Sequence, residues 1–351
     1  MGDNKIKTLF RSEKEFIRYI RKKFEKKSQN VIRSWGEDCA MIKLKHANSI
    51  LISCDDFIEG RHFELAYFPL REAGRKALVT NISDIISMGG TPLYYLVSLL
   101  IPKDFGKESI PEIYIGFKEI EKKYNMQLIG GNTEVYQGPL SIRITIIGAT
   151  VGSYGFCRNK AKVGDKIFIT NNIGLAAIGL LLFKRGWRKI HNHFITKDGN
   201  KENRPLVRKA LKEFLLPSIP YDFSIILATY NLANAAIDIS DGLVSDLYEI
   251  CKESKVGAKL FKAQLPVNKS LLSFCKQINV DFYKLAMSGG EDYQLLFTVP
   301  ESKVKLLSDI AKGHEFYCIG EIIQDSLHRV RLVDGKEEYL LEELGFDHFL
   351  H

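Results

Sequence analysis

Hydrophobic positions follow two different periods along the chain, which predicts a mixture of helices and strands. Apolar residues at helical spacing, closed by Gly, Asn or Pro signals, predict several helices. A first helix is expected to begin at Ser12, where Glu15 completes a capping box, and a long one opens at Pro69. The predicted helices after the first are 69–88, 110–124, 175–183, 206–216, 223–232, 243–253, 269–278 and 303–310.

Shorter apolar or alternating runs lie between these helices and predict strands. They are 38–44, 50–54, 93–101, 127–129, 140–151, 166–170, 235–239, 258–261, 293–299, 316–319 and 329–332. The first two are separated by the polar turn 45–49, and we expect them to pair with each other. The polar, basic segment 185–204 is expected to be a loop.

The length of 351 residues predicts two domains at about 150 residues per domain. The segment 152–164 is rich in Gly, Lys and Asn and marks a boundary, so the expected domains are 1–153 and 154–351. The first half is expected to be α+β with antiparallel strand pairs. The fold class is therefore α+β or α/β.

Composition excludes a disordered chain, because 45% of the residues are hydrophobic and 26% are charged. The net charge is +8, with Lys and Arg clustered at 18–27 and 184–189. Such clusters are typical of solvated helix faces. Zinc-finger spacing and an aromatic-basic RNA signature are absent from the sequence, so no nucleic-acid partner is expected.

Apolar stretches and cysteines indicate the compartment. The longest apolar stretches, 93–102 and 173–183, are shorter than the roughly 20 residues of a membrane span, and no secretory h-region is present. The six cysteines form no CxxC pair, which favours free thiols in a reducing environment. We expect a cytoplasmic protein without a membrane partner.

Acidic residues at the ends of predicted elements are the main chemical signal, because the chain lacks P-loop, Rossmann and GxSxG patterns. Asp238 and Ser240 are two residues apart at a strand end and therefore share a face. The five acidic segments are Gly36-Glu37-Asp38, Ser53-Cys54-Asp55-Asp56, Ser83-Asp84, Asp238-Ile239-Ser240-Asp241-Gly242 and Gly289-Gly290-Glu291-Asp292.

A single acid at a strand end is usually a turn former or helix cap. Five such segments in a net-basic chain favour a second interpretation. Clustered carboxylates repel one another unless a cation neutralises them. Mg²⁺ binds a few carboxylates together with substrate phosphates, and phosphoryl transfer depends mainly on such positioning and charge neutralisation. Spacing alone does not show that the five segments converge.

The ordered motifs identify a resemblance. They are GEDCA, SCDDFIEGRHF, TNISDIISMGGTP, IGGNT, AIDISDGL, SGGEDYQLLFT and GFDHF. Over residues 16–349 the chain resembles the thiamine-monophosphate kinase family of the aminoimidazole ribonucleotide synthetase and selenophosphate synthetase superfamily. The resemblance implies the superfamily's two-domain architecture and a homodimer that pairs its N-terminal domains, with ATP near that interface. It also implies direct in-line transfer of the ATP γ-phosphate to thiamine monophosphate, assisted by several Mg²⁺ ions.

The resemblance also implies roles for individual residues, although no residue is assigned as a certain catalyst. Arg158 can fork onto phosphate oxygens, and Phe346 can offer a flat face to an aromatic or cationic ring. The implied ATP contacts are Gly131, Arg158 and Ser240, and the implied substrate contacts are His62, Glu291 and Phe346. The implied metal-site residues are Asp38, Ser53, Cys54, Asp55, Asp84, Asn132, Asp238 and Asp241.

Three positions depart from the family pattern. Glu37 replaces the first Asp of GDD, while Asp38 keeps the ligand. Cys54 replaces the threonine of STD and can offer only a backbone carbonyl. Asn132 replaces the Asp of GGD, which keeps an oxygen but removes a charge, so a weaker Mg²⁺ site is expected; the alternative is that the nearby Asp56 supplies the missing charge.

Alternatives remain open at the sequence level. The chain could be another enzyme of the superfamily, such as an aminoimidazole ribonucleotide synthetase, or a non-catalytic thiamine-phosphate or nucleotide-binding protein. His62 could be a structural histidine and Phe346 a core aromatic. Asp292 and Tyr293 are interpreted as structural neighbours of Glu291.

Overall fold

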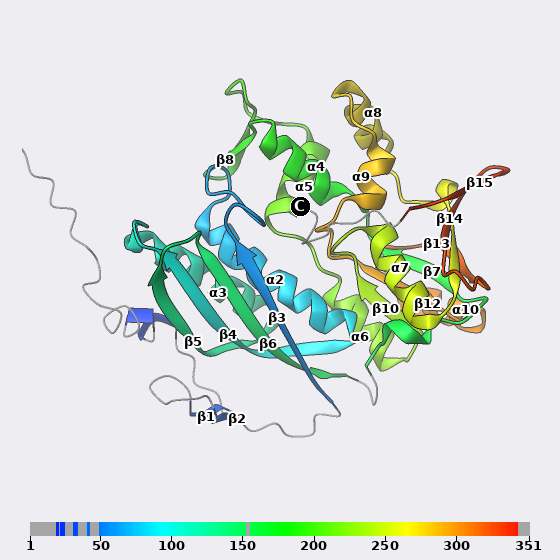
Figure 1. Ribbon diagram of the computed structural model, residues 1–351, viewed down its shortest axis with the longest axis horizontal. Helices are drawn as coiled ribbons and strands as arrows, with labels where there is room; N and C mark the ends of the chain where they lie inside the picture. The colour runs from blue at the N-terminus through cyan, green and yellow to red at the C-terminus, as the bar shows by residue number, and fades with distance from the viewer. Residues whose placement is uncertain are drawn as a thin grey trace, which may run out of the picture. The chain divides into compact units, whose positions relative to one another are not determined.

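The chain divides into two compact units (Figure 1). The computed structural model describes residues 19–20, 22–24, 31–33, 41–42, 49–151 and 155–342. The first unit comprises Met1–Ile82 with Pro92–Gly148, and the second comprises Ser83–Thr91 with Ala149–His351. The predicted start of a helix at Ser12 lies outside the described residues, whereas 19–20 and 22–24 are helical.

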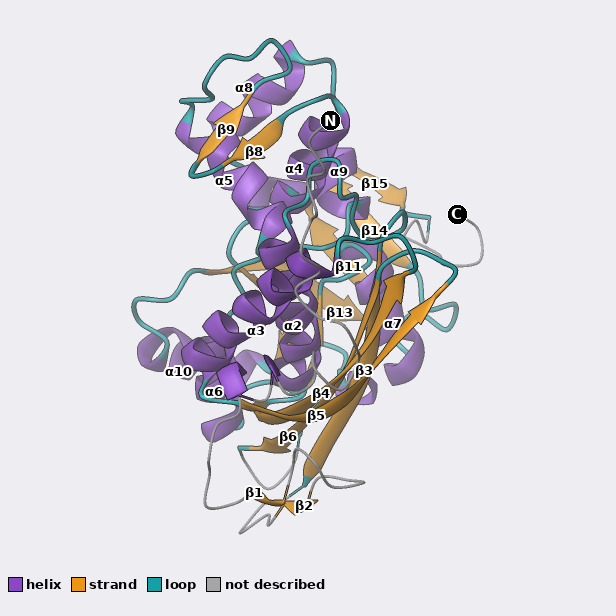
Figure 2. Ribbon diagram, turned by 90° about the vertical axis from the view of Figure 1, so that its left-hand side faces the viewer, coloured by secondary structure: helices purple, strands orange, loops and turns teal. Residues whose placement is uncertain are grey.

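The first unit contains a four-stranded sheet in the order β3-β6-β4-β5. Figure 2 shows two helices, α2 and α3, along one face of this sheet. Strands β4 and β5 are parallel and are connected through α3, which corrects the expectation of antiparallel pairs for this part. The elements are β3 (Ile50–Ile58), α2 (Leu70–Ser87), β4 (Gly90–Pro102), η1 (Lys107–Ser109), α3 (Ile110–Tyr124), β5 (Gln127–Tyr136) and β6 (Ser141–Thr150).

The two faces of this sheet differ in burial because side chains alternate along each strand. On the helix face, Tyr95 of β4 meets Phe117 of α3 edge-on, with ring centroids 6.0 Å apart. On β6, the alternate residues Ile142, Ile144 and Ile146 are fully buried. The opposite face, which we term the open face, carries Ile52, Cys54 and Asp56 of β3 together with Arg143 and Thr145 of β6.

Helices α2 and α3 cross at two glycines. A Cβ atom on Gly74 would lie 2.1 Å from the Ile113 carbonyl oxygen, and one on Gly116 would lie 2.2 Å from that of Arg71. Arg71 and Arg75 of α2 both pair with Glu119 of α3. The missing side chains let the backbones approach, and the ion pairs link the two helices at the same crossing.

The second unit is built on a seven-stranded sheet in the order β10-β12-β7-β13-β11-β14-β15 among the described residues. All neighbouring strands are antiparallel except β11 and β14. The strands are β7 (Lys166–Thr170), β10 (Ala235–Asp238), β11 (Gly257–Phe261), β12 (Leu295–Val299), β13 (Phe316–Ile323), β14 (Val330–Asp334) and β15 (Glu337–Leu340).

Helices cover this sheet. Phe223 of α6 packs against Phe297 of β12 and Phe316 of β13, within one continuous apolar core. Helix α7 contacts β10, β11 and β14. The helices are η2 (Arg158–Lys160), α4 (Leu175–Lys184), α5 (Pro205–Leu215), α6 (Tyr221–Thr229), α7 (Leu243–Ser254), η3 (Lys262–Gln264), α8 (Lys269–Gln277), α9 (Phe282–Ser288) and α10 (Glu301–Ile310).

One predicted strand pairing is wrong for the part of the chain that the structure describes. Strand β2 (Met41–Ile42) pairs with β1 (Val31–Arg33), while β3 lies beside β6, so 41–42 do not pair with 50–54 as expected. Alternation identifies a strand but does not choose its partner.

Other elements are longer than predicted or were missed. The strand predicted at 127–129 continues through Gly130 and Gly131 to Tyr136. The segment expected to be a loop, 185–204, contains the hairpin strands β8 (Arg188–Ile190) and β9 (His193–Ile195). Helix α9 and strand β15 had no sequence prediction. By contrast, α3 and β7 have the predicted bounds.

Candidate functional site

Two loops of the second unit run side by side at the end of its sheet. The loop 239–242 follows β10, and the loop 289–294 precedes β12. The amide of Glu291 donates to the Ser240 carbonyl at 2.8 Å, and that of Tyr293 donates to the Ile239 carbonyl at 2.8 Å. The structure thus brings together Ser240 and Glu291, which the sequence assigned to different ligands.

Close backbone approach explains the glycines in both loops. A Cβ atom on Gly290 would lie 2.2 Å from the Ser240 carbonyl oxygen. Gly242 has φ +128°, and a Cβ atom there would lie 2.9 Å from the Ser288 carbonyl carbon. Glu291 and Tyr293 adopt left-handed φ values of +67° and +49°. The surrounding contacts hold this strained backbone in one arrangement.

Asp238 ends β10 with a buried carboxylate. Its Oδ2 atom accepts a hydrogen bond from the Ser83 hydroxyl at 2.7 Å. Ser83 lies in the last part of α2, which belongs to the second unit, and Asp84 is its neighbour in sequence. Two of the acidic segments found in the sequence therefore meet at Asp238.

Asp246, in the first turn of α7, is a member of this site that the sequence analysis missed. Its Oδ2 atom accepts from the amides of Ser240, Asp241 and Gly242. Its pKa is raised to about 8, mainly by burial and in addition by the carboxylates of Asp238 and Asp241, against the lowering effect of the backbone hydrogen bonds. Asp246 therefore lies within the electrostatic reach of both carboxylates.

The acidic side chains at the end of β10 and in the loop 239–242 are candidate ligands for a metal ion. Within the described part of the chain, no three His, Cys, Asp or Glu side chains are grouped closely enough to hold a metal ion. Mg²⁺ commonly takes only one or two carboxylates and completes its shell with water and phosphate oxygens. The hard oxygen donors Asp238 and Asp241 fit an ion shared with a phosphate ligand.

Arg158 lies in the short helix η2, which contacts both α7 and β10. The Ser254 hydroxyl of α7 donates to the Arg158 carbonyl at 2.6 Å, which fixes the backbone at this point. The residue itself is exposed. Arg158 is thus anchored on the same two elements that carry the acidic loop, with its guanidinium on the surface.

Residues on β3 of the first unit point to two different faces. Cys54 accepts a hydrogen bond from Thr145 at 3.4 Å, and Asp56 forms a bidentate pair with Arg143 at 2.6 and 2.7 Å. Both side chains lie on the open face, so alternation places Asp55 on the other face. The same alternation places Ser53 with Asp55.

The geometry of Asp56 argues against the alternative that it supplies the charge missing at Asn132. Arg143 already neutralises the Asp56 carboxylate. In addition, Asn132 lies on β5, and β3 and β5 are opposite edges of the sheet.

Gly131, an expected ATP contact, has a structural reason to be glycine. A Cβ atom at this position would lie 2.0 Å from the Val97 carbonyl oxygen of the neighbouring strand β4. The sheet itself therefore requires the glycine. Asn132, the next residue, is exposed and pairs in register with Ser98.

His62 has a fixed ring, which fits both interpretations that the sequence left open, a structural histidine and a substrate contact. Its Nδ1 atom accepts from the Ile58 amide at 2.9 Å, and its ring stacks on Phe57 with centroids 5.9 Å apart. Because Nδ1 is an acceptor, the proton of the neutral ring is on Nε2. A fixed ring of this kind is also suited to present Nε2 to a ligand.

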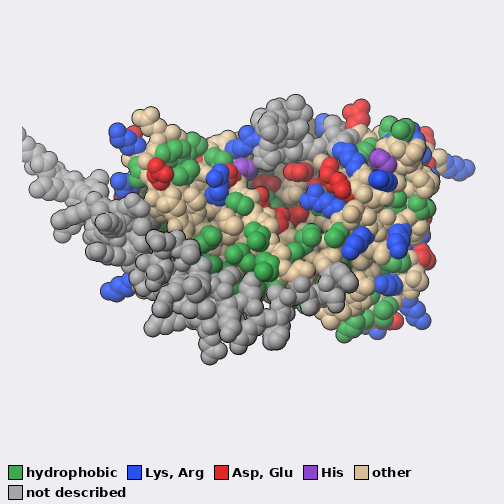
Figure 3. Space-filling view, turned by 60° about the horizontal axis from the view of Figure 1, so that its bottom comes forward, with side chains coloured by type: hydrophobic (Ala, Val, Ile, Leu, Met, Phe, Trp, Pro, Cys, Tyr) green, Lys and Arg blue, Asp and Glu red, His purple; other side chains and the backbone are tan. Residues whose placement is uncertain are grey.

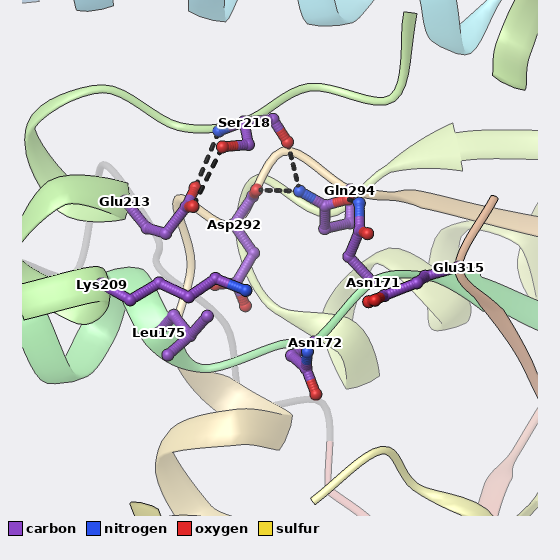
Figure 4. Close-up of a pocket in the computed structure, with 9 residues that line it drawn as sticks. All are labelled: Asn171, Asn172, Leu175, Lys209, Glu213, Ser218, Asp292, Gln294 and Glu315. Carbon is purple, nitrogen blue, oxygen red and sulfur yellow. Dashed lines mark hydrogen bonds between the residues drawn. The ribbon is translucent and has the colours of Figure 1, made fainter. Parts of the chain in front are cut away.

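Asp292, in the loop 289–294, lines a polar cavity of about 250 Å³ (Figure 4). Its carboxylate accepts from the amides of Gly174 at 2.6 Å and Ala176 at 3.3 Å, which caps α4. Burial raises its pKa to about 7. The cavity is lined by Asn171, Asn172, Leu175, Lys209, Glu213, Ser218, Asp292, Gln294 and Glu315.

Gln294 ties the same loop to its neighbours. Its amide nitrogen donates to the carbonyls of Ser218 and Asp292 (Figure 4). Its amide oxygen accepts from Thr170 and Asn171. Asp292 is therefore a structural anchor, as expected for a neighbour of Glu291, and Gln294, which had no prediction, is a second anchor on the other side of Tyr293.

Two expected site residues, Asp38 and Phe346, lie outside the described residues. The described cysteines, Cys54, Cys157, Cys251, Cys275 and Cys318, are free thiols. On the face drawn in Figure 3, Lys and Arg side chains are interspersed with acidic and hydrophobic ones. None of the described helices has both the length and the hydropathy of a membrane span.

Comparison with known proteins covers nearly the whole chain. Residues 36–150 match the model of the AIR synthase related protein N-terminal domain, and 162–333 match that of the C-terminal domain. The chain is 36% identical over 343 residues to the thiamine-monophosphate kinase of Buchnera aphidicola subsp. Schizaphis graminum, covering 97% of this chain and 99% of that protein. It is 33% identical over 321 residues to that of Escherichia coli K12, covering 90% and 91%.

Solved structures show the same relationship. The crystal structure of thiamine-monophosphate kinase from Stenotrophomonas maltophilia K279a superposes with a TM-score of 0.75 at 25% identity, over 90% of this chain and 94% of that one. The structure described as AaThiL complexed with AMPPCP and TMP gives a TM-score of 0.73 at 27% identity, over 96% and 97%. A hydrogenase maturation protein HypE in complex with ATP, at 16% identity and TM-score 0.69, shares the fold.

Proposed function

The chain belongs to the thiamine-monophosphate kinases of the AIR synthase related family, and we propose that it converts thiamine monophosphate and ATP into thiamine diphosphate and ADP. One observation carries the proposal within the structure. The loops 239–242 and 289–294, which contain the AIDISDGL and SGGEDY motifs, are joined by backbone hydrogen bonds into one acidic site.

The proposed reaction is a direct transfer. A phosphate oxygen of thiamine monophosphate attacks the γ-phosphorus of ATP in line, and the bond from that phosphorus to the β,γ-bridging oxygen breaks, which releases ADP. Arg158 donates to phosphate oxygens and Ser240 contacts the nucleotide. No residue forms a covalent intermediate.

Mg²⁺ ions are part of the proposal, and the residues present fit them. The ligands would be the carboxylates of Asp38, Asp55, Asp84, Asp238 and Asp241, with oxygens from Ser53, Cys54 and Asn132. When bound, these ions would supply neutralisation of the phosphate charge. Without bound Mg²⁺, the carboxylates would repel the phosphate groups of ATP and thiamine monophosphate. With Mg²⁺ bound, the same carboxylates would hold the reactants through the metal ions.

Substrate recognition is proposed for His62, Glu291 and Phe346. His62 has its ring fixed by Ile58, and Glu291 has its backbone fixed by Ser240. An aromatic Phe346 would stack on a flat ring of the substrate. Gly131 is proposed to let the nucleotide approach the backbone of β5.

We also propose a cytoplasmic homodimer. The open face of the first unit leaves Ile50 50% exposed and Ile52 69% exposed. Exposed apolar side chains on a sheet face are typical of an interaction surface. A second copy of the same face would cover them.

ADP release with and without thiamine monophosphate tests the function. We expect ADP release that requires both thiamine monophosphate and Mg²⁺. Release with another acceptor alone would indicate a different enzyme of the superfamily. Binding of thiamine monophosphate and nucleotide without any ADP release would indicate a binding protein.

A further inference from the structure

Asp246 accepts hydrogen bonds from the backbone of the acidic loop 239–242, and it is not one of the expected metal ligands. It lies in the first turn of α7 and is only 3% exposed. A single oxygen, Oδ2, accepts from three consecutive amides, those of Ser240 at 3.1 Å, Asp241 at 3.2 Å and Gly242 at 3.1 Å. These three amides have one acceptor in common.

The loop held in this way carries groups of the proposed site. Ser240 is the proposed nucleotide contact and Asp241 a proposed Mg²⁺ ligand. The carbonyl of Ser240 also accepts from the Glu291 amide at 2.8 Å. One carboxylate oxygen therefore controls the backbone on which the nucleotide, metal and substrate groups all depend.

Three convergent amides at the start of a helix form a concavity that attracts an anion. Here a carboxyl oxygen of Asp246, from the same chain, fills that concavity. Without it, the amides would lack their acceptor, and Gly242, at φ +128°, can adopt backbone conformations closed to other residues. The loop would then lose its single conformation.

We propose that Asp246 is a positioning residue for phosphoryl transfer, acting through the backbone of Ser240–Gly242 rather than through contact with the reactants. The inference rests on the proposed function for its kinetic consequences. Its structural core, the fixing of the loop, concerns the protein alone.

The test compares Asp246→Ala, Asp246→Asn and a control, Asp281→Ala. Asp281 caps the start of α9 by accepting from the Lys284 amide, so its removal costs a helix cap at the end of α9 opposite to the loop 289–294. We expect Asp246→Ala to lower kcat about tenfold or more and to raise the Mg²⁺ concentration for half-maximal activity. Asp246→Asn keeps an oxygen acceptor, so its kcat and its Mg²⁺ concentration for half-maximal activity should stay close to those of the wild type. Asp281→Ala changes neither.

Hydrogen exchange of the ligand-free protein gives a readout that is independent of activity. In Asp246→Ala, the amides of Ser240, Asp241, Gly242 and Glu291 exchange faster than in the wild type, whereas Asp246→Asn protects them. If Asp246→Ala does not fold, Asp246→Glu, which displaces the carboxylate by one methylene, is expected to show the same changes in kinetics and exchange.

Unchanged exchange, or an unchanged kcat and Mg²⁺ dependence in a folded Asp246→Ala protein, overturns the proposal. Equal effects in Asp281→Ala also overturn it, because they would show general destabilisation. A wild type without turnover defeats the proposed function instead, and hydrogen exchange then still decides whether Asp246 fixes the loop.

Discussion

Asn132 and Asp56 show how a single side chain changes the expected charge of a site. Asn132 has an amide where the family motif has a carboxylate, and Asp56 is the second acid of the SCDD segment, next to Asp55. The structure pairs Asp56 with Arg143 on the open face, so its charge is already neutralised. The charge lost at Asn132 is therefore not replaced by Asp56.

Restoring the carboxylate at position 132 should strengthen Mg²⁺ binding. We expect Asn132→Asp to lower the Mg²⁺ concentration for half-maximal kinase activity severalfold, because affinity for a divalent ion rises with the number of charged ligands. Asp56→Ala should leave that concentration unchanged, since it removes only an exposed pair with Arg143. A Mg²⁺ titration of the two variants and the wild type checks this. A higher Mg²⁺ requirement in Asp56→Ala alone would show that Asp56 does act at the metal site.

Asp292 should make stability depend on pH. Its pKa is raised to about 7 by burial, with Glu213 and Glu291 adding to the effect, whereas in the unfolded chain it titrates near 4. Between these values the native state holds a proton that the unfolded state has lost, so this group lowers the free energy of unfolding as pH rises from about 4 to about 7. Above pH 7 its contribution is constant.

Asp292→Asn removes this titration. The free energy of unfolding of the wild type minus that of Asp292→Asn should fall by about 2 kcal/mol between pH 5 and pH 7, as measured by urea denaturation. Asp281→Asn, at an exposed helix cap, is the matched control. A difference that stays constant or increases with pH would contradict the raised pKa.

Sequence reasoning found residues that belong to motifs and missed those that act through backbone geometry. Ser240, Asp241 and Glu291 stand out because acids and small residues recur at element ends. Asp246 carries no such signal except that it is acidic and falls in the first turn of a helix, which alone indicates an ordinary cap. Its role depends on three amides converging on one oxygen, and that convergence exists only in the folded loop.

At the scale of elements, helices were easier to predict than strand partners. The helix at 110–124 has an apolar period, a proline at its start and Asn125 in a left-handed conformation at its end, so local signals define both boundaries. The partner of β3 is instead set by contacts between distant segments, such as Arg143 with Asp56. Local alternation contains no information about that choice.

The crossing of α2 and α3 gives a prediction at this scale. Gly116→Ala should lower the free energy of unfolding by about 1–3 kcal/mol, because its Cβ atom would lie 2.2 Å from the Arg71 carbonyl oxygen and the helices would have to separate. The control is Gly106→Ala, whose Cβ atom would meet only the flexible Glu108 side chain. Urea denaturation of both variants measures the difference. Equal stability of the two would show that the helices do not need this close approach.

For the whole molecule, length predicted two domains, and the family models match two consecutive parts of the chain. The division by contacts is less simple, because Ser83–Thr91 belongs with the second unit although it lies within the first half of the sequence. A single boundary near 152–164 cannot describe a segment, 83–91, that lies in the first half of the sequence and belongs to the second unit. It arises from contacts such as that of Ser83 with Asp238, which bring distant residues together.

The proposed homodimer is tested by charging the open face. Ile52→Lys should convert a dimer into a monomer, because Ile52 is 69% exposed on an edge strand and a buried lysine there would be costly. Leu306→Lys, at a 46% exposed position on α10, should leave the dimer intact. Light scattering gives the molar mass of each. A monomeric wild type, or a dimeric Ile52→Lys protein, would contradict the proposed interface.

The most direct test of the central claim, that the acidic residues at the end of β10 and in the loop after it carry phosphoryl transfer, is the turnover of Asp238→Asn with ATP, thiamine monophosphate and saturating Mg²⁺. The account predicts a loss of about 100-fold or more. The ligand-free protein should be at least as stable as the wild type, because removing the charge relieves the unfavourable interaction of Asp238 with Asp246. Asp222→Asn, in the first turn of α6, is the control and should keep wild-type turnover. Near wild-type turnover in Asp238→Asn would contradict the account.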